Sequence, residues 1–225
     1  MATNPCVAER LACIPVDQVH MEGALALPSD PIGIVLFAHD SGSSRHSPRN
    51  NHVARVLHAH QLGTLLLDLL TPEEDLDYSQ RFDIPLLARR LLAATRWLQA
   101  RQQTAALPLA YFGASTGAAA ALQAAAELGP TIRALVSRGG RPDLAGPDAL
   151  ARVRCPTLLI VGGHDPEVLE LNRQAAALLG GPHRLDLIPG ASHLFEEACA
   201  LDAVARLAAG WLQEQLQGPR QGQAG

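Results

Sequence analysis

The sequence of 225 residues contains no lysine, and all 18 of its basic residues are arginine. With 22 acidic residues the formal net charge is −4, which gives the chain no general attraction for nucleic acid or for an anionic membrane surface. We interpret the missing lysine, together with the abundant alanine and leucine, as a compositional bias of the source. The composition therefore predicts neither nucleic acid nor membrane as a partner.

Cysteine is scarce, and long apolar runs and a basic leader are absent. The first six residues lack the features of a signal peptide, and no apolar segment approaches the length of a membrane span. We expect a cytoplasmic protein in which the four cysteines are free thiols, because they show neither C-x-x-C spacing nor the density of a disulfide scaffold. They are Cys6, Cys13, Cys155 and Cys199.

The length and the 48% of hydrophobic residues suit one well-buried core. We expect an N-terminal segment over residues 1–15, a single domain over 16–216 and a frayed tail over 217–225. Apolar strand-like runs alternate with segments of helical periodicity, which predicts a mostly parallel sheet with helices on both faces. An antiparallel hairpin is predicted over 16–27, broken at Glu22-Gly23.

One predicted helix has its apolar residues at helical spacing, from Ile84 to Leu98. The arginines of this segment fall mainly elsewhere around the helix, so we expect them to form a solvated face. They are Arg89, Arg90, Arg96 and Arg101.

Gly113-Ala114-Ser115-Thr116-Gly117 follows an apolar run and precedes an alanine-rich helix. Strand, sharp turn and helix form the context of a G-x-S-x-G nucleophile elbow, in which the glycines prevent collisions with the neighbouring strand and helix. Ser115 is therefore the candidate nucleophile. The alternative is a βα turn that merely tolerates glycine.

A catalytic triad also needs a carboxylate and a histidine, here in the order Ser, Asp, His. Asp165 follows the apolar strand 157–161, and His193 follows the strand expected over about 184–188. Alternatively, Asp165 caps the helix that begins at Pro166 and His193 is only a turn residue. The shared order and the shared position after strands favour the triad.

The strand 33–38 ends in the small-residue loop His39-Asp40-Ser41-Gly42, whose amides are candidates for an oxyanion hole. We expect one donor from the amide of Thr116 and the other from Ser41, with Asp40 as the second choice. An ordinary Gly/Ser turn is the alternative for this loop.

Four loops together resemble the dienelactone hydrolase-related branch of the α/β-hydrolase superfamily over residues 16–215. The resemblance implies an α/β-hydrolase fold with Ser115 as nucleophile, Asp165 as acid and His193 as base. The chain differs from that pattern in having Ser115 where dienelactone hydrolase proper has a cysteine, and Asp40 where a glycine usually follows the loop histidine. The loops are H-x-S-G-S-S, G-A-S-T-G, G-G-x-D and P-G-A-S-H-L-F.

Only residues 138–156 separate the sixth strand from the acid strand, so no substantial lid is expected. The expected walls of the site are residues 41–46, 70–72, 138–141 and 194–195. Within them, Arg45 and Arg138, helped by Arg141, are candidates for binding a substrate carboxylate, and Phe195 is a candidate substrate contact.

These features favour a serine hydrolase that cleaves a small carboxylic ester, lactone or thioester through an acyl-enzyme, without cofactor or metal. The first alternative is a catalytically silent member of the same fold that binds a ligand or partner. The second is a metal hydrolase, because five histidines cluster in the sequence, although no H-E-x-x-H motif accompanies them. They are His39, His46, His52, His58 and His60.

Overall fold

The computed structural model describes residues 7–39 and 42–217, which form one eight-stranded sheet with the strand order β1-β2-β4-β3-β5-β6-β7-β8. β2 runs antiparallel to both β1 and β4, and all other neighbours are parallel. The strands are β1 Ala8–Val16, β2 Val19–Leu27, β3 Gly33–Ala38, β4 Leu62–Leu67, β5 Leu109–Ala114, β6 Ile132–Arg138, β7 Thr157–Gly162 and β8 His183–Ile188.

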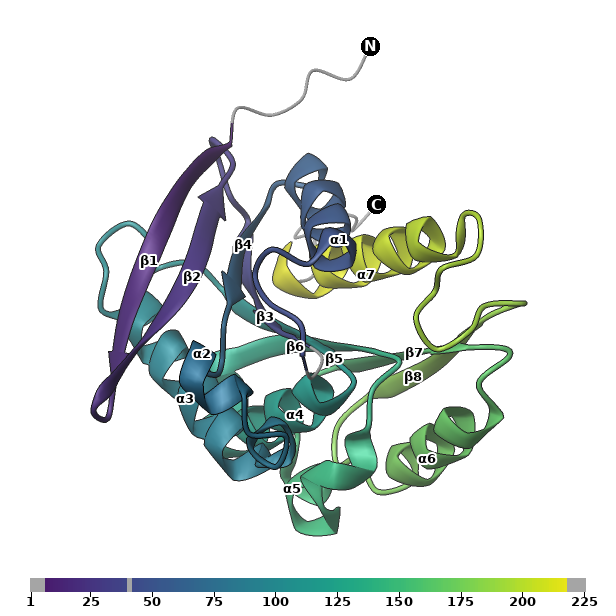
Figure 1. Ribbon diagram of the computed structural model, residues 1–225. Coiled ribbons are helices and arrows are strands. Elements are labelled where there is room, and N and C mark those ends of the chain that lie inside the picture. Colours follow the sequence, from purple (N-terminus) through teal and green to yellow (C-terminus); the bar gives the residue numbers. More distant parts are fainter. Residues whose placement is uncertain (1–6, 40–41, 218–225) are drawn as a thin grey trace.

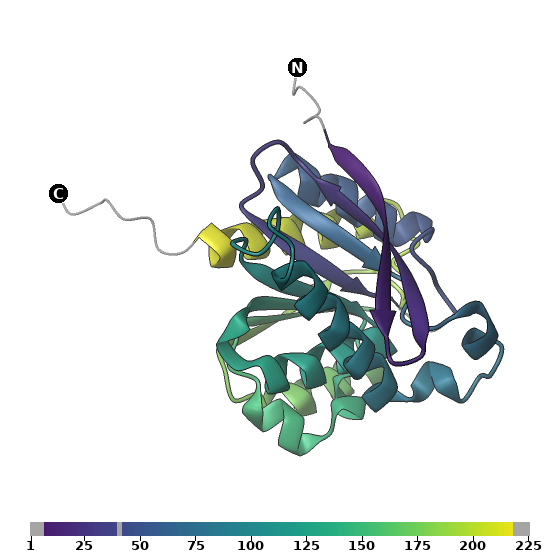
Figure 2. The same ribbon diagram turned by 90° about the vertical axis from the view of Figure 1, so that its left-hand side faces the viewer.

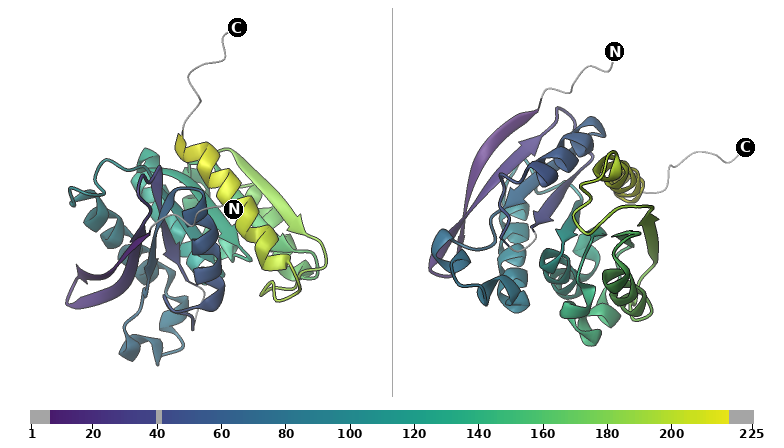
Figure 3. Two further views of the ribbon diagram at one scale, coloured as in Figure 1. Left: turned by 90° about the horizontal axis from the view of Figure 1, so that it is seen from above. Right: turned by 45° about the vertical axis from the view of Figure 1, so that its right-hand side comes forward.

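Helices cover both faces of this sheet, as Figure 1 and the right-hand view of Figure 3 show. α1 and α7 pack together on one face, and α3, α4, α5 and α6 lie on the other. The predicted α/β-hydrolase fold is confirmed. The helices are α1 Pro48–Ala59, α2 Pro72–Asp75, α3 Ile84–Gln99, α4 Thr116–Leu128, α5 Pro147–Arg152, α6 Pro166–Ala176 and α7 Ala200–Gln217, with short 3-10 turns η1 Gln80–Phe82, η2 Gly129–Thr131 and η3 Pro142–Ala145.

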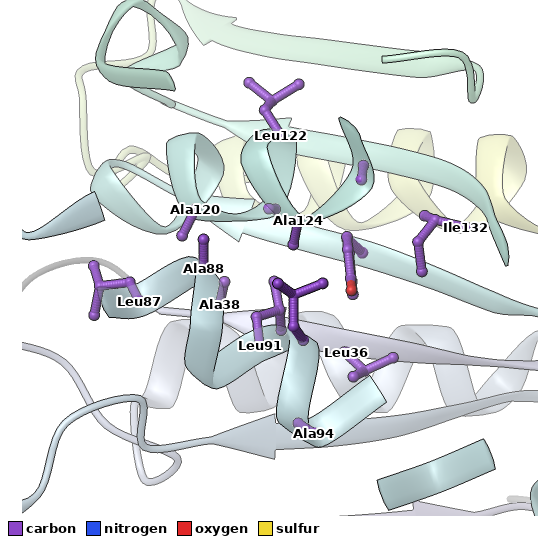
Figure 4. Packing of buried hydrophobic residues seen from close by; sticks show 14 of the residues in the cluster. Leu36, Ala38, Leu87, Ala88, Leu91, Ala94, Ala120, Leu122, Ala124 and Ile132 are labelled. Carbon is purple, nitrogen blue, oxygen red and sulfur yellow. The ribbon is translucent and has the colours of Figure 1, made fainter. Parts of the chain in front are cut away.

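The alternation of β3 divides the core into two layers. Leu36 and Ala38 point into the cluster that contains α3 and α4, whereas Val35 and Phe37 point into the cluster with α1 and α7. Figure 4 shows α3 and α4 meeting over the first cluster. All four residues of the run 118–121 in α4 are fully buried, and their small side chains let the helix pack closely against the strands and the neighbouring helices.

The N-terminal hairpin differs from the prediction. Its turn lies at Asp17-Gln18, and Gly23 sits inside β2, so β1 includes residues that the sequence placed before the domain. The reason is the neighbouring strand: a Cβ at Gly23 would lie 3.1 Å from the carbonyl oxygen of Leu66 in β4. Here the glycine serves close strand approach and not a turn.

The segment between β4 and α3 carries α2 and η1, which project from the edge of the sheet in Figure 2. A capping box between Thr71 and Glu74 caps the N-terminus of α2. Arg90 of α3 is only 3% exposed, donates to Glu74 at 2.6 Å and lies 3.4 Å from the carbonyl oxygen of Leu69. The prediction of a wholly solvated arginine face is therefore wrong for Arg90, which anchors this segment.

In the described part of the chain, no helix combines the length and the apolar character needed to cross a bilayer.

Candidate active site

Ser115 lies at the turn between β5 and α4 with φ 50° and ψ −122°, a backbone conformation that costs a residue with a side chain on the order of 1–3 kcal/mol. A Cβ at Gly113 would lie 2.5 Å from Cα of Ala118, and one at Gly117 would lie 2.5 Å from the carbonyl oxygen of His39. Both contacts are too close, so the expected reason for the two glycines is confirmed.

The loop after β6 holds this turn in place. The backbone amide of Arg141 donates to the carbonyl oxygen of Ser115 at 3.0 Å. The side chain of Asn172 in α6 is fully buried and donates to the carbonyl oxygen of Gly140 at 3.0 Å. The elbow is therefore tied to two further elements on the face that carries α4.

Asp165 and His193 meet at the carboxyl ends of β7 and β8, and His193 Nδ1 lies 2.7 Å from Asp165 Oδ2. The Asp165 side chain is 14% exposed and the His193 side chain 41%. The carboxylate makes no capping hydrogen bond to α6, although Asp165 occupies the N-cap position, so the capping interpretation is wrong. With Nδ1–H donated to the carboxylate, Nε2 of His193 is left as a proton acceptor.

The histidine loop packs against glycines that leave no room for side chains. A Cβ at Gly162 would lie 2.5 Å from the carbonyl oxygen of Ser192, and one at Gly139, which has φ 50°, would lie 3.2 Å from the carbonyl oxygen of His193. The loop that carries Gly139 is the one that binds the backbone of Ser115 two residues later. It therefore adjoins both the elbow and the imidazole.

The described residues contain no hydrogen bond between Ser115 and His193, although the predicted triad requires His193 to accept the Ser115 proton. The structure thus brings His193 to Asp165 but leaves its second contact open. Catalytic hydrogen bonds are often long in structures without substrate and tighten when substrate binds.

Thr116 is the first residue of α4, so its amide has no acceptor within the helix and lies at the positive end of the helix dipole. It remains the candidate oxyanion donor. The other two candidates, Ser41 and Asp40, lie outside the described residues. Their neighbour His39 is 6% exposed, with Nδ1 2.7 Å from the side-chain nitrogen of Asn50.

A cavity of about 350 Å³ opens beside Thr116. Two of the expected walls line it in part, residues 42–45 and 70–72, whereas 138–141 and 194–195 do not appear among its described lining residues. Its further walls come from β2, the loop after β4, α2, η1 and α3, and the sequence did not indicate that these segments meet. These are His20, Glu22, Asp68, Leu69, Glu73, Asp75, Arg81 and Leu87.

The arginines that were candidates for binding a substrate carboxylate are paired with acids of the protein or buried. Arg45 lines the cavity but pairs with Glu22 at 2.5 Å and with Asp68. Arg141 forms a bidentate pair with Asp143 at 2.8 and 2.9 Å, and Arg138 is only 4% exposed at the end of β6. Neither Arg45 nor Arg141 therefore offers an uncommitted guanidinium to a carboxylate.

Phe195 is 2% exposed, with φ 56°, and belongs to the cluster of α1 and α7. Phe195 packs into this core cluster and is not among the described residues that line the cavity beside Thr116, so its role is core packing. The positive φ at this position turns the chain after His193.

The histidines that cluster in the sequence contact different polar side chains and do not meet at one point. His52 lies 2.7 Å from Asp202, His58 2.8 Å from Thr64 and His60 3.1 Å from Gln213. Burial lowers the pKa of His58 below its ordinary value. Within residues 7–39 and 42–217, no three side chains of His, Cys, Asp or Glu are grouped as a metal would need.

Comparison with solved structures gives a dienelactone hydrolase from Anabaena variabilis at 54% identity and a TM-score of 0.89, covering 93% of this chain and 98% of that one. The chain belongs to the dienelactone hydrolase-like family of α/β-hydrolases. The esterase Est1E from Butyrivibrio proteoclasticus, at 15% identity and a TM-score of 0.79 over 92% of this chain and 99% of its own, shares the fold of this family. No protein-family model matches the chain.

A curated relative from Mycobacterium tuberculosis, named "Putative phosphoribosyl transferase", is 53% identical over 218 residues. The match covers 97% of this chain but 49% of the relative, so the chain spans about half of that protein. The hydrolase neighbours support a hydrolase for the part that the chain represents.

Proposed function

We propose that the protein is a serine hydrolase that cleaves a small carboxylic ester, lactone or thioester through an acyl-enzyme. The observation that carries the proposal is the Asp165–His193 hydrogen bond of 2.7 Å at the sheet edge where Ser115 occupies its strained turn. A carboxylate that orients an imidazole, beside a serine held on an elbow, is the arrangement that acyl transfer requires.

In this mechanism Ser115 Oγ attacks the substrate carbonyl and passes its proton to His193 Nε2. Asp165 holds the ring in the tautomer that can accept it and stabilises the imidazolium. The Thr116 amide donates to the developing oxyanion. His193 then protonates the leaving alcohol or thiol, and water attacks the acyl-enzyme by the reverse sequence of proton transfers.

The lengths of the relatives support this choice over phosphoribosyl transfer. The dienelactone hydrolase is matched over 98% of its length, so this chain resembles a whole hydrolase. The mycobacterial protein is matched over 49%, so its name also describes sequence that this chain does not match.

A fluorophosphonate probe tests the assignment, because it labels only an activated serine. We expect labelling of the unmodified protein and its loss in Ser115→Ala, together with at least about a thousandfold fall in ester turnover. Ser29→Ala, which removes an exposed hydroxyl after β2, is the matched control.

A noncatalytic binding protein is the second candidate, favoured by the missing hydrogen bond between Ser115 and His193. Complete absence of labelling in the folded, unmodified protein would support it and reject the hydrolase. Labelling that persists in Ser115→Ala would move the nucleophile elsewhere.

A further inference from the structure

We propose that the cavity beside Thr116 takes a neutral, mainly apolar part of the ester and selects against a substrate carboxylate. This inference rests on the proposed function and adds the substrate class. It follows from the charges on the cavity walls. They disfavour a substrate carboxylate, whereas the arginines of the loops had suggested that one would be bound.

Both terminal nitrogens of the Arg45 guanidinium already pair with neighbouring acids. Its guanidinium binds Asp68 and approaches Glu22 at 2.5 Å, and its backbone amide donates to Asp68 at 2.6 Å. Its side chain is 17% exposed, and that of Asp68 is 18% exposed, so water screens the pair only partly. A substrate carboxylate would have to displace carboxylates already held in good geometry.

Arg81 is also paired with an acid of the protein. It contacts both carboxylate oxygens of Asp75, at 2.9 and 3.0 Å, and donates to the backbone oxygen of the same residue at 2.7 Å. A Cβ at Gly42 would lie 3.1 Å from its Nη1, so the guanidinium lies against the loop after β3. The arginine thus closes the wall between this loop and η1 instead of presenting a free charge.

Carboxylates outnumber guanidinium groups among the described lining residues. The four carboxylates of Glu22, Asp68, Glu73 and Asp75 exceed the two guanidinium groups of Arg45 and Arg81, so the formal charge of the lining is −2 with its two histidines counted as neutral. Glu73 is exposed at the mouth and has no ion pair among the described residues. An entering anion therefore meets the exposed carboxylate of Glu73 and, among the described lining residues, only guanidinium groups that already pair with acids.

The rest of the lining suits a neutral group. Leu69, Leu70, Pro72 and Leu87 supply apolar surface. Thr116, the first residue of α4, also lines the cavity. An uncharged, mainly apolar part of a substrate would complement this lining.

The test uses matched p-nitrophenyl esters. The first pair consists of glutarate and its monomethyl ester, which differ by one negative charge. The second pair consists of 4-(trimethylammonio)butyrate and 5,5-dimethylhexanoate, which have the same shape and differ by one positive charge. Values of kcat/KM are compared for each pair, after the rate of spontaneous hydrolysis has been subtracted.

We expect kcat/KM for glutarate to be on the order of tenfold below that for its methyl ester, as two excess charges several ångströms away in a water-like dielectric would produce. The trimethylammonio ester should be at least as fast as its neutral isostere. Glu73→Gln should shrink the glutarate penalty about threefold. Glu214→Gln, an exposed site on α7, should leave it unchanged.

Equal or faster hydrolysis of glutarate would overturn the charge selection while leaving the hydrolase intact. An unchanged penalty in Glu73→Gln would also contradict it, because Glu73 is the acid at the mouth without an ion pair. Failure to hydrolyse any of the four esters, with no fluorophosphonate labelling, would instead overturn the proposed function and this inference with it.

Discussion

Replacing Arg90 with methionine tests how much the contact between α3 and α2 contributes to the stability of the fold. The change removes a charge-assisted hydrogen bond to Glu74 at 2.6 Å and a long one to Leu69 at 3.4 Å, while methionine keeps most of the apolar stem. A hydrogen bond to a charged group is worth about 1.5–3 kcal/mol. The full penalty of breaking a buried ion pair, about 3–5 kcal/mol, does not apply, because the Glu74 side chain is 21% exposed and can be rehydrated.

We therefore expect Arg90→Met to lower the free energy of unfolding by about 2 kcal/mol. Urea titration followed by circular dichroism measures the change, with an unaltered m-value as the sign that only stability has moved. Arg96→Met on the same helix is the control, since Arg96 is 67% exposed and 3.5 Å from Glu127, and such pairs contribute about 0–1 kcal/mol. If the two variants lost the same stability, the anchoring role of Arg90 would be refuted.

Three further predictions concern the same scaffold. Partial burial alone would raise the pKa of Glu74, but hydrogen bonds from Arg90 and Thr71 lower it below its ordinary value, so the stabilisation is present above about pH 4.3 and is lost as pH falls below it. Denaturation midpoints measured between pH 6 and 3 should show this loss, and the methionine variant should show less of it. Gly117→Ala should destabilise strongly, whereas Gly210→Ala, where a Cβ meets nothing within 4 Å, should stabilise α7 by roughly 0.5–1 kcal/mol in thermal melts. Asp165→Asn should lower kcat by orders of magnitude with the fold intact by circular dichroism, and a near-normal kcat would remove the carboxylate from the proposed triad.

Local motifs made the elbow predictable. Gly113 and Gly117 each lie two positions from Ser115, so the constraint that they satisfy is visible within five positions of sequence. The positions of Asp165 and His193 were also predictable, because each directly follows a strand and parallel strands bring their carboxyl ends to one edge.

Contacts between distant segments were not predictable in this way. Arg45 finds Glu22 only because β2 lies beside β4 in the sheet order, and the sequence does not encode that neighbourhood in any short pattern. Gly23 was mistaken for a turn because glycine serves both turns and close strand contacts, and only the partner strand distinguishes them. Arg90 was misplaced because its partner Glu74 lies in a separate helix.

The alanines at positions 118–121 carry a consequence for how the sequence can vary. Because successive helix residues point in different directions and all four are fully buried, their methyl groups set how closely α4 packs against its several neighbours, and α4 begins at Thr116. A leucine at Ala119 would add several methylene equivalents to a layer with no free volume and would push the whole helix outward. In a saturation library screened for activity, position 119 should return only glycine, alanine and serine, although the residue itself never meets substrate.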